Sequence, residues 1–200
     1  MKYYIFTGLL FLTACAGGNG IQLHHYIDRN DTKDNFIYCY GYSCSQSQRL
    51  GFNNFEWQEI IKIFKPKAIT AEQERVQIGN VIAMMETYTA HLAGTQNDGP
   101  KAPIKRQSIY ELDCIDETIN TSQYLKFLDQ EGLLHFHHLG HPAFRGGLFT
   151  GMYPHNSAVI IEIETNTPYV IDSYIYANGV EPDIRTLQSW FDTKVEDLKE

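Results

Sequence analysis

The stretch His155-Asn-Ser-Ala-Val-Ile-Ile-Glu-Ile-Glu164 is followed by Thr165-Asn-Thr-Pro168 and then by Tyr169-Val-Ile-Asp-Ser-Tyr-Ile175. β-Branched residues are concentrated in the first and third segments, as is typical of strands, whereas Asn and Pro in the second favour a turn. We therefore expect two antiparallel strands joined by a turn. This pairing would bring Asp172, on the returning strand, roughly opposite the beginning of the strand that His155 opens.

Apolar residues recur at helical spacing in two segments upstream of this hairpin. The first segment starts at residue 54 and is predicted to be a helix that ends at Pro66. The second helix is predicted over residues 70–94, because Thr70 is a good N-cap with Gln73 three positions later, and Gly94 suits a helix end. Both helices are expected to contribute to the core.

A third helix has two possible beginnings, since Ser108 and Asp113 each stand three positions before an acidic residue. A beginning at Asp113 would place Cys114 at the first helical position. In either case Gly132 is expected to end the helix.

The remaining segments have weaker patterns. Residues 21–52 are polar, aromatic and rich in turn residues, so we expect an irregular N-terminal wrap. A strand is predicted over residues 133–139, a loop over 140–154 and a terminal helix over 183–198. The expected fold class is α+β, with helices packed on a small antiparallel sheet in a single domain over residues 26–200.

The N-terminus has the layout of a signal peptide: a basic residue, a short apolar run, and small residues before a cysteine. The run is far shorter than the ~20 residues of a membrane-spanning helix. The sequence Leu12-Thr-Ala-Cys15 resembles the lipobox of bacterial lipoproteins. This resemblance implies that residues 1–14 are removed and that Cys15 is acylated, with palmitate as an expected chain. Residues 15–25 would then form a tether to the lipid bilayer, and Ala16 is compatible with an outer membrane location facing the periplasm.

The composition is that of a soluble globular domain, with 43% hydrophobic residues and a mean hydropathy of -0.32. The formal net charge is -8, so the electrostatic footprint of a nucleic-acid-binding protein is absent. No cofactor is expected.

The chain contains four cysteines. Cys15 is assigned to the lipid. Cys39 and Cys44 are close enough in sequence to close a disulfide in an oxidising compartment, with two free thiols or a metal-binding pair as alternatives. Cys114 is left as a solitary thiol, which is either a small buried residue or a reactive group.

Three residues have the types and order that nucleophilic cysteine chemistry needs. A thiolate is favoured at a helix N-terminus, a base must activate it, and an acid must orient the base. Cys114, His155 and Asp172 follow one another in the chain in these roles. The alternative is that Cys114 is a core residue and that the other two are polar groups of the strands.

The segments Leu112-Asp-Cys-Ile115, His155-Asn-Ser-Ala-Val-Ile160 and Tyr169-Val-Ile-Asp-Ser173 resemble the transglutaminase-like cysteine peptidases, a branch of the papain-like fold. The resemblance covers about residues 108–176. It implies that Cys114 is the nucleophile, His155 the base and later the acid, and Asp172 the orienting acid in acyl transfer.

The chain departs from this family at three points. Asp113 and Asp116 flank Cys114, and their negative charge would disfavour a thiolate and oppose the helix dipole. Two residues separate His155 from the following Ala-Val pair, whereas the family often has them adjacent. An oxyanion donor is also not evident, and Gln107 and Tyr110 are the candidates nearest to the nucleophile in sequence.

The segment 135–141 holds the densest histidine cluster of the chain. In a strand His135 and His137 would share one face, and with His138 or His141 they could bind zinc or copper.

We therefore consider three functions. The leading one is an envelope cysteine hydrolase or acyltransferase with peptide, protein or peptidoglycan-linked substrates. The alternatives are a non-catalytic lipoprotein that binds a protein or glycan partner, and a periplasmic metal-binding lipoprotein.

Overall fold

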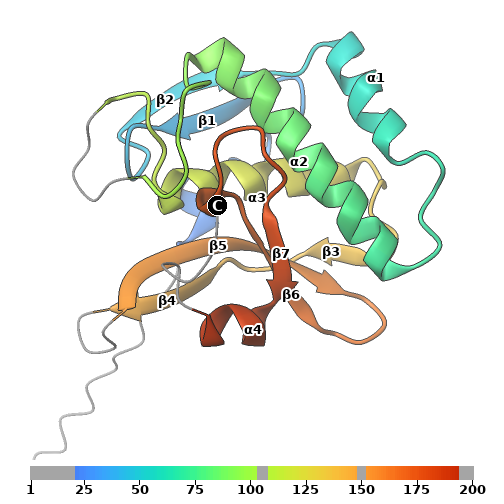
Figure 1. The fold of residues 1–200 in the computed structure, drawn as a ribbon. Helices are drawn as coiled ribbons and strands as arrows, with labels where there is room; N and C mark the ends of the chain where they lie inside the picture. Colours follow the sequence, from blue (N-terminus) through green and yellow to red (C-terminus); the bar gives the residue numbers. More distant parts are fainter. Residues whose placement is uncertain (1–20, 103–107, 148–151, 194–200) are drawn as a thin grey trace, which may run out of the picture.

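The computed structural model describes residues 21–102, 108–147 and 152–193. Within these residues, four helices pack with a five-strand antiparallel sheet and a separate two-strand hairpin (Figure 1). The elements are, in order, β1 (Phe36–Tyr40), β2 (Gln46–Leu50), α1 (Asn54–Ile63), α2 (Ala71–Ala93), α3 (Cys114–Gln130), β3 (His137–Leu139), β4 (Ala143–Gly147), β5 (Met152–Glu162), β6 (Pro168–Asp172), β7 (Asp183–Thr186) and α4 (Leu187–Asp192). Two short 3-10 helices cover Leu23–His25 and Ser173–Ile175.

The predicted hairpin is confirmed as β5 and β6. Their register pairs Ala158 with Ile171 and Ile161 with Pro168. The strand order is β3-β5-β6-β7, and β4 pairs with the N-terminal part of β5. β5 is therefore long enough to extend past the end of β6, which places His155 beyond the last residue of its partner strand.

The three predicted helices are also confirmed. α1 and α2 begin after the N-caps Asn53 and Thr70, and α2 ends at Gly94 with a φ of 80°. Asp113 rather than Ser108 is the N-cap of α3. Asp113 accepts hydrogen bonds from two backbone N–H groups of the first turn, and Asp116 accepts one from the N–H of Asp113, so the cap is closed from both sides.

Two expectations for irregular segments are wrong. Residues 21–52 contain the β1–β2 hairpin. The signal was weak because β2 reads Gln-Ser-Gln-Arg-Leu, in which only Leu50 is buried, while β1 supplies buried Phe36 and Tyr38. The expected loop over 140–154 contains β4 and the beginning of β5, which pair with each other around a register shift near Gly147.

Of the strand expected over residues 133–139, only the last three residues form a strand, β3. The backbone N–H groups of His135 and Phe136 donate to the carboxylate of Glu74, at 2.7 and 2.9 Å, instead of joining the sheet. The expected terminal helix is also wrong at its beginning, because Asp183–Thr186 is a strand paired with β6. Helix begins only at α4, after the N-cap Thr186, and residues 194–198 lie outside the described residues.

Both faces of the central sheet are buried. Ala158, Ile160 and Ile171 belong to the main core with α1, α2 and α3, whereas Val159 and Val170 pack with Trp190 of α4. Figure 1 shows α2 and α3 on one side of the sheet and α4 on the other. The alternation of side chains along a strand explains this division, since neighbouring residues point to opposite faces.

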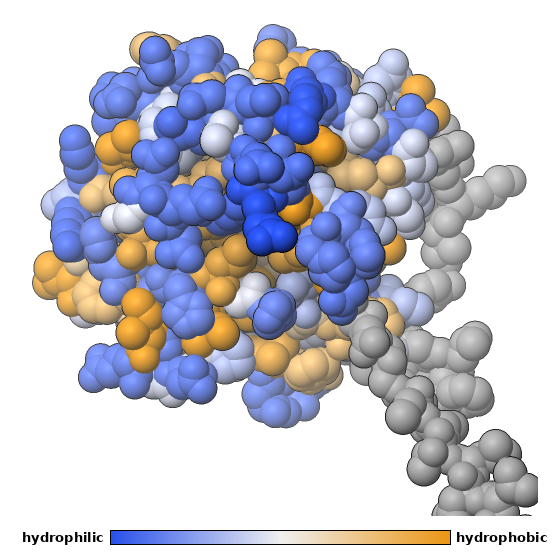
Figure 2. All heavy atoms as spheres, turned by 180° about the vertical axis from the view of Figure 1, so that it is seen from behind, coloured by the Kyte–Doolittle hydropathy of each residue, from blue (hydrophilic) through white to orange (hydrophobic). Residues whose placement is uncertain are grey.

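None of the helices in the described part of the chain is long and apolar enough to cross a membrane. The face seen from behind mixes hydrophilic and hydrophobic residues (Figure 2). Cys15 and the expected signal peptide 1–14 lie outside the described residues.

Candidate active site

The structure brings His155 of β5 and Asp172, the last residue of β6, into direct contact. Their atoms Nε2 and Oδ2 are 2.7 Å apart, and both side chains are buried. His155 and Asp172 are not directly opposite each other in the register of the two strands. Because β5 extends beyond the end of β6, the side chain of His155 can nevertheless reach Asp172. With Nε2 committed to Asp172, Nδ1 is the ring nitrogen left to act on a neighbouring group.

Cys114 is that neighbouring group. Burial alone would lower the pKa of His155, but the charge and hydrogen bond of Asp172, together with the nearby Cys114, raise it to about 9. Cys114, His155 and Asp172, which come from three elements, therefore lie together at the N-terminal end of α3. This is the geometry that the sequence pattern predicts for acyl transfer.

Cys114 is half-buried and occupies the first helical position of α3. The Asp113 side chain accepts from the next two N–H groups, of Ile115 and Asp116. The N–H of Cys114 has no acceptor within its own helix, so it can donate to an oxyanion formed beside its sulfur. Tyr110 instead stacks on Tyr40 with ring centroids 6.4 Å apart. The other donor candidate, Gln107, lies outside the described residues.

Trp190 of α4 lies at the site, although the sequence did not single it out as a site residue. Its indole N–H donates to Oδ2 of Asp172 at 2.7 Å, so this oxygen accepts from both Trp190 and His155. The indole also lies beside the imidazole, with centroids 5.5 Å apart. No local pattern links Trp190 to Asp172, because the contact depends on α4 folding back over β6.

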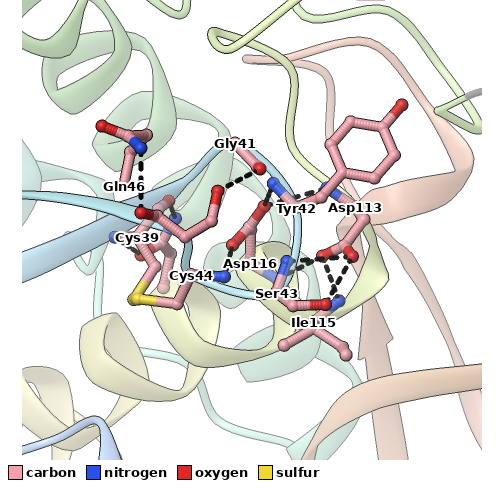
Figure 3. The surroundings of a disulfide bond; sticks show 11 residues. Cys39, Gly41, Tyr42, Ser43, Cys44, Gln46, Asp113, Ile115 and Asp116 are labelled. Atoms are coloured by element: carbon pink, nitrogen blue, oxygen red, sulfur yellow. Dashed lines mark hydrogen bonds between the residues drawn. A yellow bond between two sulfur atoms is a disulfide. The ribbon is translucent and has the colours of Figure 1, made fainter. Parts of the chain in front are cut away.

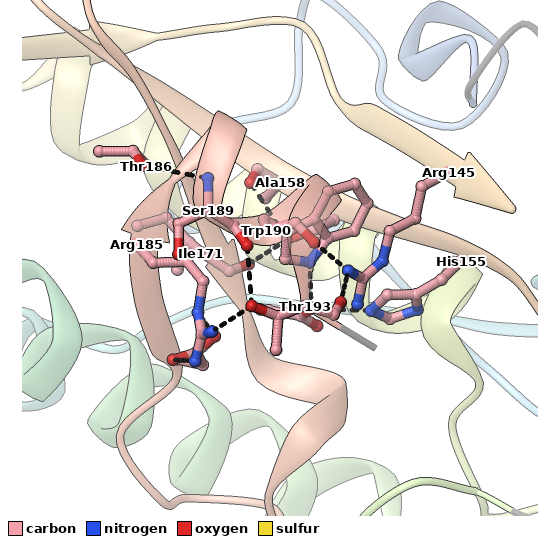
Figure 4. A network of polar contacts seen from close by, with 12 residues as sticks. Arg145, His155, Ala158, Ile171, Arg185, Thr186, Ser189, Trp190 and Thr193 are labelled. Atoms are coloured by element: carbon pink, nitrogen blue, oxygen red, sulfur yellow. Dashed lines mark hydrogen bonds and ion pairs between the residues drawn. The ribbon is translucent and has the colours of Figure 1, made fainter. Parts of the chain in front are cut away.

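Arg145 of β4, the residue paired with His155 on β5, holds Trp190 in place (Figure 4). Its guanidinium lies 4.2 Å from the centre of the indole ring and donates to the backbone carbonyls of Trp190 and Thr193. The Asp172 carboxylate is thus covered by a side chain that is itself fixed by hydrogen bonds and by a cation–π contact.

A group of buried acids lies next to the site and was also missed. Burial raises the pKa of Glu86 to about 7 and that of Asp98 to about 7, and it raises the pKa of Glu117 well above its ordinary value. Glu86 accepts from the N–H of Gly179 at 3.2 Å, and the charge of Asp172 contributes to the raised pKa of Glu117. Asp98 accepts from the N–H of Leu112, two residues before Cys114, at 2.7 Å.

The histidines of segment 135–141 do not form the alternative metal site. His137 is buried, with Nδ1 2.8 Å from Glu74 and Nε2 3.1 Å from Arg75, so both ring nitrogens are engaged. His135 and His141 are exposed. Among the residues that the structure describes, no group of three His, Cys, Asp or Glu side chains could hold a metal ion.

The predicted disulfide between Cys39 and Cys44 is present, and Cys114 is a free thiol.

No protein-family model, curated protein or solved structure matches this chain, so its candidate site rests on the geometry of its own residues.

Proposed function

We propose that this protein is a cysteine hydrolase or acyltransferase that acts on amide bonds through Cys114, His155 and Asp172. The observation that carries the proposal is the 2.7 Å contact between His155 and Asp172 at the N-terminal end of the helix that Cys114 opens. The resemblance to transglutaminase-like cysteine peptidases supports the same assignment of roles.

The reaction would proceed in two stages. The Cys114 thiol gives its proton to His155 and its sulfur attacks the amide carbon, while the negative charge that develops on oxygen is stabilised by the N–H of Cys114 at the helix N-terminus. His155 donates a proton to the leaving amine, and the acyl group remains on sulfur as a thioester. Water or an acceptor amine then attacks the thioester while His155 takes its proton, which regenerates the thiol.

The proposal includes a location. The N-terminal signal and Cys15 support attachment to a lipid bilayer in the cell envelope, and the disulfide suits the oxidising periplasm. Peptide, protein or peptidoglycan-linked substrates follow from this location.

The test measures how fast iodoacetamide alkylates Cys114 near neutral pH, by mass spectrometry of the Cys114 peptide. His155→Ala should lower the rate by about tenfold or more, because the thiolate loses its partner. His138→Ala, which removes an exposed histidine, is the matched control and should leave the rate unchanged. Equal rates in wild type and His155→Ala would instead indicate a non-catalytic scaffold.

A further inference from the structure

The residues between Cys39 and Cys44 form a turn of unusual conformation. Gly41, Tyr42, Ser43 and Cys44 have φ values of 82°, 73°, 55° and 54° in succession. This left-handed region is unfavourable for residues with a Cβ atom, so three consecutive non-glycine residues remain there only when their surroundings hold them. The disulfide supplies one constraint, since it joins the two ends of the turn.

The N–H groups of this turn point at two carboxylates of α3 (Figure 3). Tyr42 and Cys44 donate to the two oxygens of Asp116, at 2.7 and 2.6 Å, and Ser43 donates to Asp113 at 3.0 Å. Successive N–H groups in a turn form a concave site for an anion. Here the anions are side chains of the protein itself.

Asp113 and Asp116 are also the two members of the capping box of α3, and Cys114 lies between them. Asp116 is fully buried and accepts from the N–H of Asp113 at 3.2 Å in addition to its two bonds from the turn. The turn, the cap and the first helical residue therefore form one hydrogen-bonded unit.

A second anchor lies one helical turn further along α3. The side-chain amide of Asn120 donates to the carbonyl of Cys39 at 2.8 Å and accepts from its N–H at 2.9 Å. Residues 113, 116 and 120 lie on one face of the helix, and this face binds both ends of the disulfide-closed segment.

We propose that the Cys39–Cys44 turn positions the nucleophile, that Asp116 is the positioning residue, and that reduction of the disulfide switches the site off. The proposal rests on the proposed function of Cys114. A dithiol reductant would supply two electrons and two protons, the S–S bond would break to give two thiols, and the reductant would become a disulfide. Cys44 is half-buried, so an exchanging thiolate can approach it.

Reduction would act on Cys114 through the carboxylates. Once the S–S bond is broken, the turn can leave its left-handed conformation, and its N–H groups move away from Asp113 and Asp116. Burial raises the pKa of Asp116 to about 7 against the opposing hydrogen bonds from Tyr42 and Cys44, so losing these two donors would raise it further and weaken the capping box. The first turn of α3, which holds Cys114 beside His155, would then lose its support.

The test compares the alkylation rate of Cys114 across a pH series in three states of the full protein. These states are the oxidised form, the form treated with dithiothreitol, and the form that is reduced and then re-oxidised. The rate near neutral pH should fall by about tenfold or more on reduction, with the pH profile displaced to higher pH, and should recover on re-oxidation. A Cys39→Ser/Cys44→Ser variant should match the reduced form and ignore the reductant.

Two variants separate positioning from general helix capping. Asp116→Asn keeps the shape but loses the charge and one acceptor, so it should slow alkylation in the oxidised protein. Glu56→Gln makes the corresponding change in the capping box of α1, far along the chain from the site, and should leave the rate unchanged.

The outcomes distinguish this inference from the proposed function. Unchanged rate and pH profile after verified reduction of Cys39 and Cys44 would overturn the inference while leaving the triad intact. Faster alkylation that no longer depends on His155 would also overturn it, because the disulfide would then hold the whole domain together and not the nucleophile in particular. Insensitivity to His155→Ala in the oxidised protein would refute the proposed function itself.

Discussion

At the scale of single residues, the site depends on one carboxylate oxygen. Oδ2 of Asp172 accepts from His155 and from Trp190, each at 2.7 Å, in a region from which water is largely excluded. Hydrogen bonds to a charged group are strong, and burial makes their loss more costly. The carboxylate therefore governs both the orientation and the protonation of the imidazole.

Asp172→Asn should lower the pKa of His155 from about 9. The amide can still accept from Nε2, but it carries no negative charge, so burial, which favours the neutral ring, is opposed mainly by Cys114. An NMR titration of the His155 ring protons measures the change. Asp183→Asn, on the neighbouring strand and paired with Arg185, is the control and should leave this pKa close to 9. A value that stays near 9 in Asp172→Asn would show that another group sets it.

The same pKa has a consequence for stability. The folded-state pKa of His155 is raised from 6.5 to about 9, so its stabilising contribution is complete below pH 6.5 and is lost as pH rises through about 9. The difference corresponds to roughly 3 kcal/mol. Asp172→Asn should abolish this part of the pH dependence.

At the scale of elements, α4 acts as a cover for the second face of the sheet. It has only six residues, and its one buried side chain, Trp190, packs on Val159 and Val170 while donating to Asp172. Arg145 attaches the helix to β4 through backbone carbonyls. So short a helix owes its stability to these contacts and not to intrinsic propensity.

Trp190→Phe should lower the free energy of unfolding by about 1–3 kcal/mol, because the buried Asp172 carboxylate loses a donor. Chemical denaturation measures the change. Phe191→Leu alters the adjacent, partly exposed residue of the same helix and should stay within about 0.5 kcal/mol of wild type. Similar stabilities for the two variants would mean that the indole N–H contributes little to the fold.

At the scale of the whole molecule, the core between α2, α3 and the site contains buried carboxyl groups whose pKa is raised toward or above neutral pH. Glu86, Asp98 and Glu117 are all buried, and one oxygen of Glu86 has no hydrogen-bond partner in the described part of the chain. Burial of a carboxyl group favours its protonated form. The protein should therefore become less stable as these acids ionise.

Glu86→Gln tests this expectation. The folded-state pKa of Glu86 is raised from 4.5 to about 7, so wild type should lose up to roughly 3 kcal/mol of stability as pH rises from about 4.5 to 7. The free energy of unfolding of the variant should not show this loss. In denaturation experiments the variant should therefore become more stable relative to wild type as pH rises across the same interval. Glu72→Gln, at an exposed position of the same helix, should follow the wild-type pH dependence. A constant difference between Glu86→Gln and wild type would contradict a raised pKa.

Local sequence predicted the elements whose signals are local. The cap at Thr70, the end at Gly94 and the turn between β5 and β6 depend on residues within a few positions of one another, whereas the sequence left the cap of α3 open between Ser108 and Asp113. Strands β2 and β7 were missed because they are short and their pairing partners, not their own patterns, define them.

The sequence by itself determined the three helices, the β5–β6 hairpin and the order in which Cys114, His155 and Asp172 occur, and it favoured the Cys39–Cys44 bridge that the structure contains. Only the tertiary structure decided that His155 meets Asp172, that Trp190 shares the same oxygen, and that the disulfide turn binds Asp116. The physical reason is the separation along the chain of the residues that interact. Caps and turns arise from interactions between near neighbours in the chain, whereas these contacts join residues 17 to 72 positions apart and exist only after the core has packed.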